Sequence, residues 1–158
     1  MSAVQAAEPG SLVDGLVTFR IGRREYATRL DGVREVVRLQ GLSDLPGMRP
    51  PLAGVLDLRG AALPVLDLRA AGADGGDVLV LAGALPAVAS GVVSDDAMVG
   101  VAVDQVRAVV AADALVPAGS GDAGVLPGYV QAVLRSSDGV VFLVDLEQMV
   151  QAVGSGSA

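Results

Sequence analysis

The 158-residue sequence has no His, no Cys and no Trp, and all eleven of its basic residues are Arg, so Lys is absent too. Without His, the chain lacks the commonest general base and the commonest transition-metal ligand. Without Cys, it has no disulfide, no thiolate nucleophile and no zinc-binding Cys pair, which agrees with a reducing compartment. Without Lys, it has neither a Schiff-base residue nor the lysine of a phosphate-binding loop. We therefore predict no catalytic residue, no metal site and no cofactor.

The formal net charge is −7, and the sequence contains no basic run. Such a chain repels nucleic-acid phosphates and anionic membrane surfaces, and two Phe and two Tyr offer no platform for stacked bases. Residues 78–94 are uncharged, but they include Gly83 and Pro86 and fall short of the ~20 residues of a membrane span. Residues 1–15 lack the basic and apolar regions of a signal peptide. We expect a soluble protein with no nucleic-acid partner and no direct membrane insertion.

The hydrophobic content is 52% but the aromatic content is only 3%, so the core must consist mainly of Val, Leu and Ala. Abundant Val, interrupted by 21 Gly and 8 Pro, favours many short strands over long helices. The apolar alternation predicts strands at residues 16–21, 25–30, 33–39, 54–59, 64–69, 78–81, 87–93, 99–103, 106–110, 129–134 and 140–144. A helix is expected from residue 145 to about residue 153.

Four residues are expected to shape turns and helix starts: Gly54, Asp67, Gly139 and Asp145. Asp67 is placed to cap a helical turn that Gly72 would end, and Asp145 is placed to cap the C-terminal helix. The Asp-Gly pair that ends at Gly139 favours a primed turn between the last two strands.

An internal repeat divides the chain into two similar halves. Three segments recur in the same order: residues 30–37 as 103–110, residues 52–55 as 126–129, and residues 66–68 as 144–146. The repeat predicts an all-β fold of two five-stranded barrels, at about 16–70 and 77–146, because closing a sheet removes exposed edges. Each unit is small, so the two should share an apolar seam, and exchange of strands between them stays open. The domain is expected to span 12–153, with a flexible leader at 1–11 and a flexible tail at 154–158.

The phrase G-V-L-D-L-R-G-A-A-L-P-V-L-D-L-R at residues 54–69 resembles the CheW family of chemotaxis coupling proteins. The stretches at 26–37, 45–47, 101–106 and 142–146 are similar to that family as well. The resemblance implies a fold of two SH3-like barrels, with a short C-terminal helix here, and no enzymatic activity. It also implies a cytoplasmic adaptor, recruited to membrane-associated receptor arrays. Its partners would be the cytoplasmic tip of chemoreceptors (methyl-accepting chemotaxis proteins) and the regulatory domain of the kinase CheA.

By the same resemblance, five residues are candidates for receptor binding: Val33, Glu35, Leu58, Arg59 and Gly60. Glu35 and Arg59 would form a bidentate pair beside the receptor groove, whereas the alternative is two solvated charges of little energetic value. Gly60 is equally interpretable as a turn residue for a tight hairpin or as a point of close partner approach.

Three valines lie within five positions, at Val33, Val36 and Val37, although a strand buries only one face. One of them is expected to be an exposed contact residue, and the resemblance favours Val33; the alternative is that all three are buried. The chain departs from the family pattern at Asp57, where Asn is usual, and in residues 83–98, which are longer and richer in Ala. The absence of Lys is a third departure.

Other functions stay open beside the chemotaxis adaptor. A related scaffold would serve a different kinase pathway, such as gliding or pilus motility. A carboxylate-dependent hydrolase would need converging acids, for which the candidates are the pair Asp95 and Asp96 and the pair Asp57 and Asp67. Adjacent Asp residues in a turn usually satisfy local backbone donors instead, and no D-T-G or D-S-G motif surrounds any of them.

Overall fold

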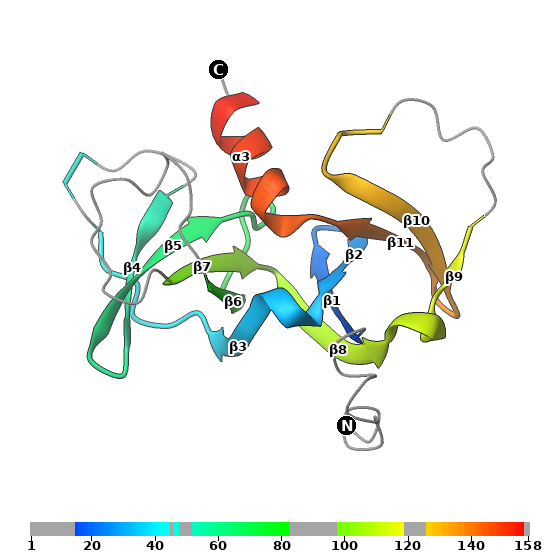
Figure 1. Ribbon diagram of the computed structural model, residues 1–158. Helices are drawn as coiled ribbons and strands as arrows, with labels where there is room; N and C mark the ends of the chain where they lie inside the picture. The colour runs from blue at the N-terminus through cyan, green and yellow to red at the C-terminus, as the bar shows by residue number, and fades with distance from the viewer. Residues whose placement is uncertain (1–14, 45, 48–51, 83–97, 119–125, 157–158) are drawn as a thin grey trace.

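The computed structural model describes residues 15–44, 46–47, 52–82, 98–118 and 126–156 and shows strands throughout, followed by one α-helix (Figure 1). The strands are β1 (Gly15–Ile21), β2 (Arg24–Arg29), β3 (Val33–Arg38), β4 (Leu52–Leu58), β5 (Ala61–Asp67), β6 (Asp77–Ala82), β7 (Met98–Val103), β8 (Gln105–Ala111), β9 (Val116–Pro117), β10 (Val130–Ser136) and β11 (Gly139–Val144). Short 3₁₀ turns, η1 (Leu30–Gly32) and η3 (Ala112–Ala114), follow β2 and β8, and the helix is α3 (Leu146–Gly156). The predicted all-β class with a C-terminal helix is confirmed. The predicted strand at 87–93 and the leader lie outside the described residues.

The strands form two sheets, and each sheet combines strands from both halves of the chain. One has the order β8-β1-β2-β11-β10-β9 and the other the order β3-β6-β7-β5-β4. The hairpin β1–β2 thus lies in the sheet of the second half, and the hairpin β6–β7 lies in the sheet of the first half. The sequence bounds 16–70 and 77–146 therefore do not describe the two sheets, because the halves exchange their first hairpins.

The two sheets repeat the same arrangement. In both sheets, the strand that follows a half's own first hairpin pairs antiparallel with the hairpin from the other half. Thus β8 pairs with β1, and β3 pairs with β6. In both, one strand of that hairpin pairs in parallel with the last strand of the other half, as β2 does with β11 and β7 with β5. The sequence repeat therefore corresponds to a structural repeat, with β3, β4 and β5 equivalent to β8, β10 and β11.

Aromatic contacts attach the exchanged hairpin β1–β2 to β11. Tyr26 stacks on Phe19 at a centroid distance of 5.6 Å and contacts Phe142 at 5.9 Å. The three residues are opposite one another across β1, β2 and β11, so their rings form a row across the strands. Such pairs stabilise a sheet by roughly 0.2–1 kcal/mol each. Three of the four aromatic residues of the chain thus lie where its two halves join.

Each sheet is drawn together by the segment that follows its edge strand. Ser43, beyond β3, forms two backbone hydrogen bonds of 2.9 Å with Val55 of β4, the strand at the opposite edge. At the equivalent place in the other sheet, β9 pairs with β10, and the Ala118 N–H donates to the Val133 carbonyl at 2.9 Å. These contacts satisfy edge groups that would otherwise invite pairing with another chain.

Three apolar clusters form the interior. The largest draws on β1, β2, β5, β6, β7, β11 and α3, and so spans both sheets. Two smaller clusters fill the individual sheets, one under β4–β5 and one under β10–β11. The shared cluster is the apolar seam that the small size of each unit requires.

The helix α3 begins as the sequence predicts. Asp145 accepts a hydrogen bond at 3.0 Å from the Gln148 N–H, which is the contact of an N-cap. Leu146, Met149 and Val150 are buried in the shared cluster. The helix ends at Gly156 rather than near residue 153, so the first three residues of the expected flexible tail are helical.

Three expected turns differ in the structure. Gly54 lies within β4, at a bulge opposite β5, and forms no turn. Asp67 ends β5 and accepts a hydrogen bond from the Arg69 N–H at 2.9 Å, so it forms a local turn and no helix follows. Gly139 starts β11 with φ 131°, and the two preceding turn residues have negative φ, so the turn is not of the primed type.

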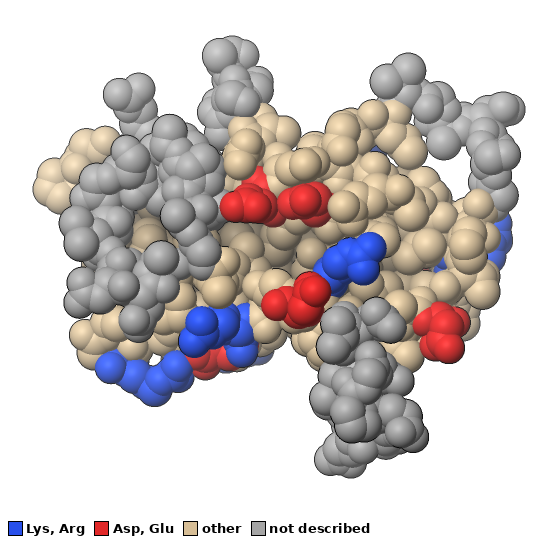
Figure 2. All heavy atoms as spheres, viewed as in Figure 1, with Lys and Arg blue, Asp and Glu red and all other residues tan. Residues whose placement is uncertain are grey.

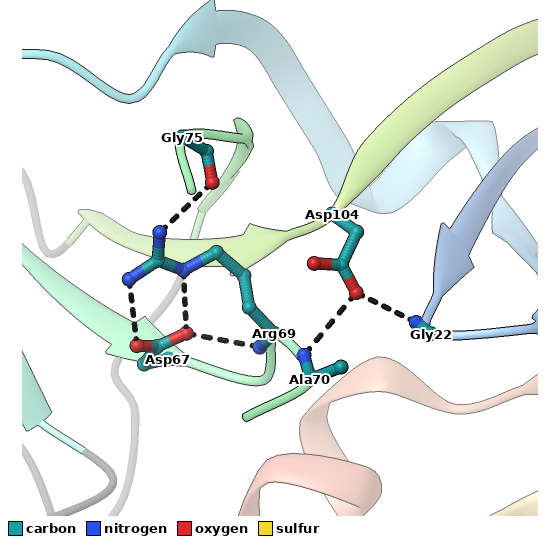
Figure 3. Close-up of polar contacts among 6 residues, drawn as sticks. All are labelled: Gly22, Asp67, Arg69, Ala70, Gly75 and Asp104. Carbon is teal, nitrogen blue, oxygen red and sulfur yellow. Dashed lines mark hydrogen bonds and ion pairs between the residues drawn. The ribbon is translucent and has the colours of Figure 1, made fainter. Parts of the chain in front are cut away.

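Two carboxylates hold the junction of the two halves (Figure 3). Asp104, between β7 and β8, accepts hydrogen bonds from the Gly22 N–H of the β1–β2 turn at 2.6 Å and from the Ala70 N–H beyond β5 at 3.2 Å. Asp67 accepts hydrogen bonds of 3.0 Å from the Arg69 guanidinium, which also donates to the Gly75 carbonyl at 2.8 Å. Together they fix the chain between β5 and β6 against the exchanged hairpin.

The ion pair of Asp67 and Arg69 links stability to pH. Burial raises the pKa of the Asp67 carboxyl, but the hydrogen bonds and the charge of Arg69 outweigh burial and hold that pKa below its usual value. The hydrogen bond to Asp67 correspondingly raises the pKa of Arg69. A lowered pKa in the folded state means that the stabilisation is complete above about pH 4, the unfolded pKa, and is lost as pH falls through the folded pKa.

We predict that Asp67→Asn lowers the free energy of unfolding at pH 7 by about 1 kcal/mol, because a charged hydrogen-bond acceptor is lost at a partly exposed site. The difference in the free energy of unfolding between Asp67→Asn and the wild type should shrink toward zero near pH 2. Urea denaturation at both pH values measures it, with Asp138→Asn on an exposed turn as the control. A difference that does not change with pH would contradict the linkage.

Gly54 and Gly128, which are aligned in the repeat, should respond differently to Ala. A Cβ at Gly54 would lie 2.5 Å from the Ser43 carbonyl oxygen, and its φ of 153° disfavours other residues; a Cβ at Gly128 meets nothing within 4 Å. We predict that Gly54→Ala lowers the free energy of unfolding by about 1–3 kcal/mol and Gly128→Ala changes it by less than about 0.5 kcal/mol. Equal midpoints in urea would show that the sheet does not depend on this contact.

Candidate functional site

The β4–β5 hairpin ends in a tight turn formed by Arg59 and Gly60. Arg59 has φ 52° and Gly60 has φ 89°, and positive values at both central residues are those of a type I′ turn. Among the described residues, Arg59 alone has a positive φ without being glycine. Asp57 accepts a hydrogen bond at 2.7 Å from the Gly60 N–H, across the turn. The turn centres on Arg59 and Gly60, between the paired residues Leu58 and Ala61.

Glu35 and Arg59, the pair predicted from sequence, are joined by two hydrogen bonds. Arg59 Nη1 donates to Glu35 Oε1 at 3.1 Å, and Arg59 Nη2 donates to Glu35 Oε2 at 2.5 Å. Hydrogen bonds from the guanidinium hold the pKa of Glu35 below its usual value, and the same bonds raise the pKa of Arg59. The pair links β3 to the tip of the β4–β5 hairpin, although β3 and β4 are the two outermost strands of their sheet.

The other predicted contact residues divide between surface and interior. Gly60 is exposed, but Leu58 is only 8% exposed and packs in the cluster beneath the hairpin, so it supports the turn from inside. Along β3, alternation places Val33 and Val37 toward the interior, whereas Val36 is 42% exposed. The exposed valine is therefore Val36 rather than Val33, because Val33 and Val37 lie on the same face of β3 and Val36 lies on the other.

Val33 instead lines a pocket of about 270 Å³ between the two sheets. Its walls come from β2, η1, β3, β6, β7, β10, β11 and the start of α3. Apolar walls from Val99 and Val144 lie beside charged groups, of which Arg29 is basic and Asp145 and Glu147 are acidic. Figure 2 shows acidic and basic side chains close together around the middle of this face, beneath α3. No pattern in the sequence indicates this pocket, because the strands that enclose it come from both halves.

The predicted acidic pair of Asp57 and Asp67 does not converge. Asp57 bonds to its own turn and Asp67 bonds to Arg69, so the two serve separate contacts. Within the described residues, no three acidic side chains come close enough to hold a metal ion. The other predicted acidic pair, at residues 95 and 96, lies outside the described residues. Among the helices that the structure describes, none is both long and apolar enough to cross a membrane.

Comparison with known proteins agrees with this architecture. Residues 15–154 match the family model of the CheW-like domain. The chemotaxis protein CheW of Bacillus subtilis is 35% identical over 54 residues, which are 34% of this chain and 35% of that protein. The probable chemotaxis protein CheW of Rhizobium etli is 38% identical over 55 residues, which are 35% of this chain and 36% of that protein. These alignments thus span about a third of the length of the curated relatives.

A solved structure shows the same fold. The crystal structure of the scaffolding protein TtCheW from Thermoanaerobacter tengcongensis matches with a TM-score of 0.62 and 18% sequence identity, covering 84% of each chain. The predicted fold of two SH3-like β units is confirmed by this match, and the predicted resemblance by the family model. This chain therefore belongs to the CheW-like domain family.

Proposed function

We propose that this protein is a non-catalytic chemotaxis adaptor that couples the cytoplasmic tips of chemoreceptors to the regulatory domain of the kinase CheA. It would act in the cytoplasm, at membrane-associated receptor arrays. The observation that carries the proposal is β3, which contributes Val33 to the pocket between the sheets and Glu35 to the ion pair at the hairpin tip. One strand thus connects an apolar recess with a fixed polar contact.

The pocket suits a helical partner better than a small reactant. Apolar walls at the junction of two sheets can receive the apolar stripe of an amphipathic helix. Among the described residues that line the pocket, three are acidic (Asp31, Asp145 and Glu147) and one is basic (Arg29), which favours a partner with basic or donor groups there. The recess combines apolar walls with a polar margin, as protein-recognition sites commonly do.

A second surface, on the other sheet, is a candidate for the kinase. Val116 and Val140 are 53% and 45% exposed and flank Arg135 on neighbouring strands β9, β10 and β11. Exposed apolar side chains grouped around a cation are typical of a protein contact. We propose that the CheA regulatory domain binds here, which would leave the pocket to the receptor. Small, partly apolar interfaces of this kind would be weak individually and strengthened by multivalency in an array.

The experiment that tests the proposal is a pull-down of the purified chain with a receptor cytoplasmic fragment and with a CheA regulatory domain, separately and together. Binding of each alone, and of both at once, supports an adaptor with two separate surfaces. Binding to neither, or mutual exclusion of the two, contradicts it. Capture of the regulatory domain of a gliding or pilus kinase in preference to CheA would assign the adaptor to that pathway instead.

We predict that Arg59→Ala weakens binding to the receptor fragment roughly 10-fold, since it removes a charged group and releases Glu35 at the hairpin tip. The thermal midpoint should stay nearly unchanged because the pair is exposed. Arg135→Ala, in the equivalent hairpin of the other sheet, is the matched control and should leave receptor binding intact. Equal affinity of the Arg59→Ala variant and the wild type, measured by calorimetry, would exclude the ion pair from the receptor site.

A further inference from the structure

We propose that Asp57 is the positioning and specificity-determining residue of the β4–β5 hairpin: one carboxylate oxygen fixes the turn that presents Arg59, and the other faces the partner. The partner group that meets it would then be a hydrogen-bond donor, either a cation or an N–H. The second part of this inference rests on the proposed adaptor function, whereas the first part concerns the protein alone.

The positioning role follows from the backbone of the turn. A left-handed conformation is unfavourable for a long side chain such as Arg59, so neighbouring contacts must maintain it. Asp57 Oδ1 provides one by accepting the Gly60 N–H at 2.7 Å. The bidentate contact to Glu35 then requires the guanidinium to leave the turn in one direction. Without the bond from Asp57, the turn can relax and the alignment of the two charged groups is lost.

The specificity role follows from the second oxygen of the same carboxylate. Asp57 is exposed, and in the described part of the structure only its Oδ1 forms a hydrogen bond. Its neighbour across the hairpin is Ala62, also exposed and too short to cover it. Because Glu35 and Arg59 neutralise each other, the charge of Asp57 leaves the hairpin tip with a net charge of −1. If a partner buried this tip without offering a hydrogen-bond donor, the carboxylate would lose its hydration without compensation, and binding would be weaker.

The equivalent hairpin of the other sheet is built differently. Leu58 and Ala61 are the last pair of β4–β5, and Ser136 and Gly139 are the last pair of β10–β11, so Arg135 has the position equivalent to Asp57. There the turn is held by Ser136 Oγ, which accepts the Asp138 N–H at 3.1 Å. The two equivalent positions therefore carry opposite charges, and the acidic one is combined with the Glu35 and Arg59 pair.

Two neutral substitutions separate the roles. Asp57→Asn keeps an oxygen that can accept the Gly60 N–H, whereas Asp57→Ala removes it, and both remove the charge. The pKa of Glu35, followed by NMR titration of the free protein, should stay low in Asp57→Asn and rise toward its usual value in Asp57→Ala. The same Glu35 pKa in the two variants would overturn the positioning role. Asp138→Ala is the control for loss of an exposed acidic charge and should leave it unchanged.

Binding to a purified receptor cytoplasmic fragment then tests specificity. Asp57→Asn should bind about 10-fold more weakly than the wild type, and its binding should depend less on salt, because one charged contact is lost. Unchanged affinity of Asp57→Asn would overturn the specificity role. If the wild type itself does not bind the fragment, both the adaptor function and the specificity role fail, while the Glu35 titration still decides the positioning role.

Discussion

The exchange of hairpins between the two halves is the constraint on which the rest of the structure depends. Each half contributes its first hairpin to the sheet of the other half, so β1–β2 joins β11 and β6–β7 joins β5. This pairing draws both sheets onto one shared apolar cluster, which α3 completes. The described residues of this cluster are apolar, whereas the carboxylate of Asp104 binds backbone N–H groups of two other segments.

The candidate site is a product of the same arrangement. The pocket lies where the sheets meet, and β3 borders it because β3 pairs with the incoming strand β6. Glu35, on the same strand as Val33, contacts the β4–β5 hairpin, so a single sheet sets the spacing between recess and ion pair. In the adaptor function proposed above, the molecule acts through such surfaces, so the physical demand on it is precision of geometry.

Much of this could be predicted from sequence because the local signals are strong. The alternation of Val17, Phe19 and Ile21 indicates β1, and Asp145 before an apolar face indicates α3. The exchange could not be predicted, since the repeat makes β1–β2 and β6–β7 equivalent and leaves their partners undetermined. Asp67 carries the same helix-start signal as Asp145, but Arg69 follows two residues later and binds its carboxylate instead. Tertiary pairing of strands decided the first case, and a local ion pair decided the second.

The exchanged hairpins also determine what happens if the chain is cut. A break in the segment between β5 and β6 separates the two halves covalently, yet each half leaves its first hairpin in the sheet of the other. In the native arrangement neither fragment holds all the strands of one sheet, whereas the two together hold the strands of both. After such a cut the two pieces are still joined through the hydrogen-bond ladders of both sheets.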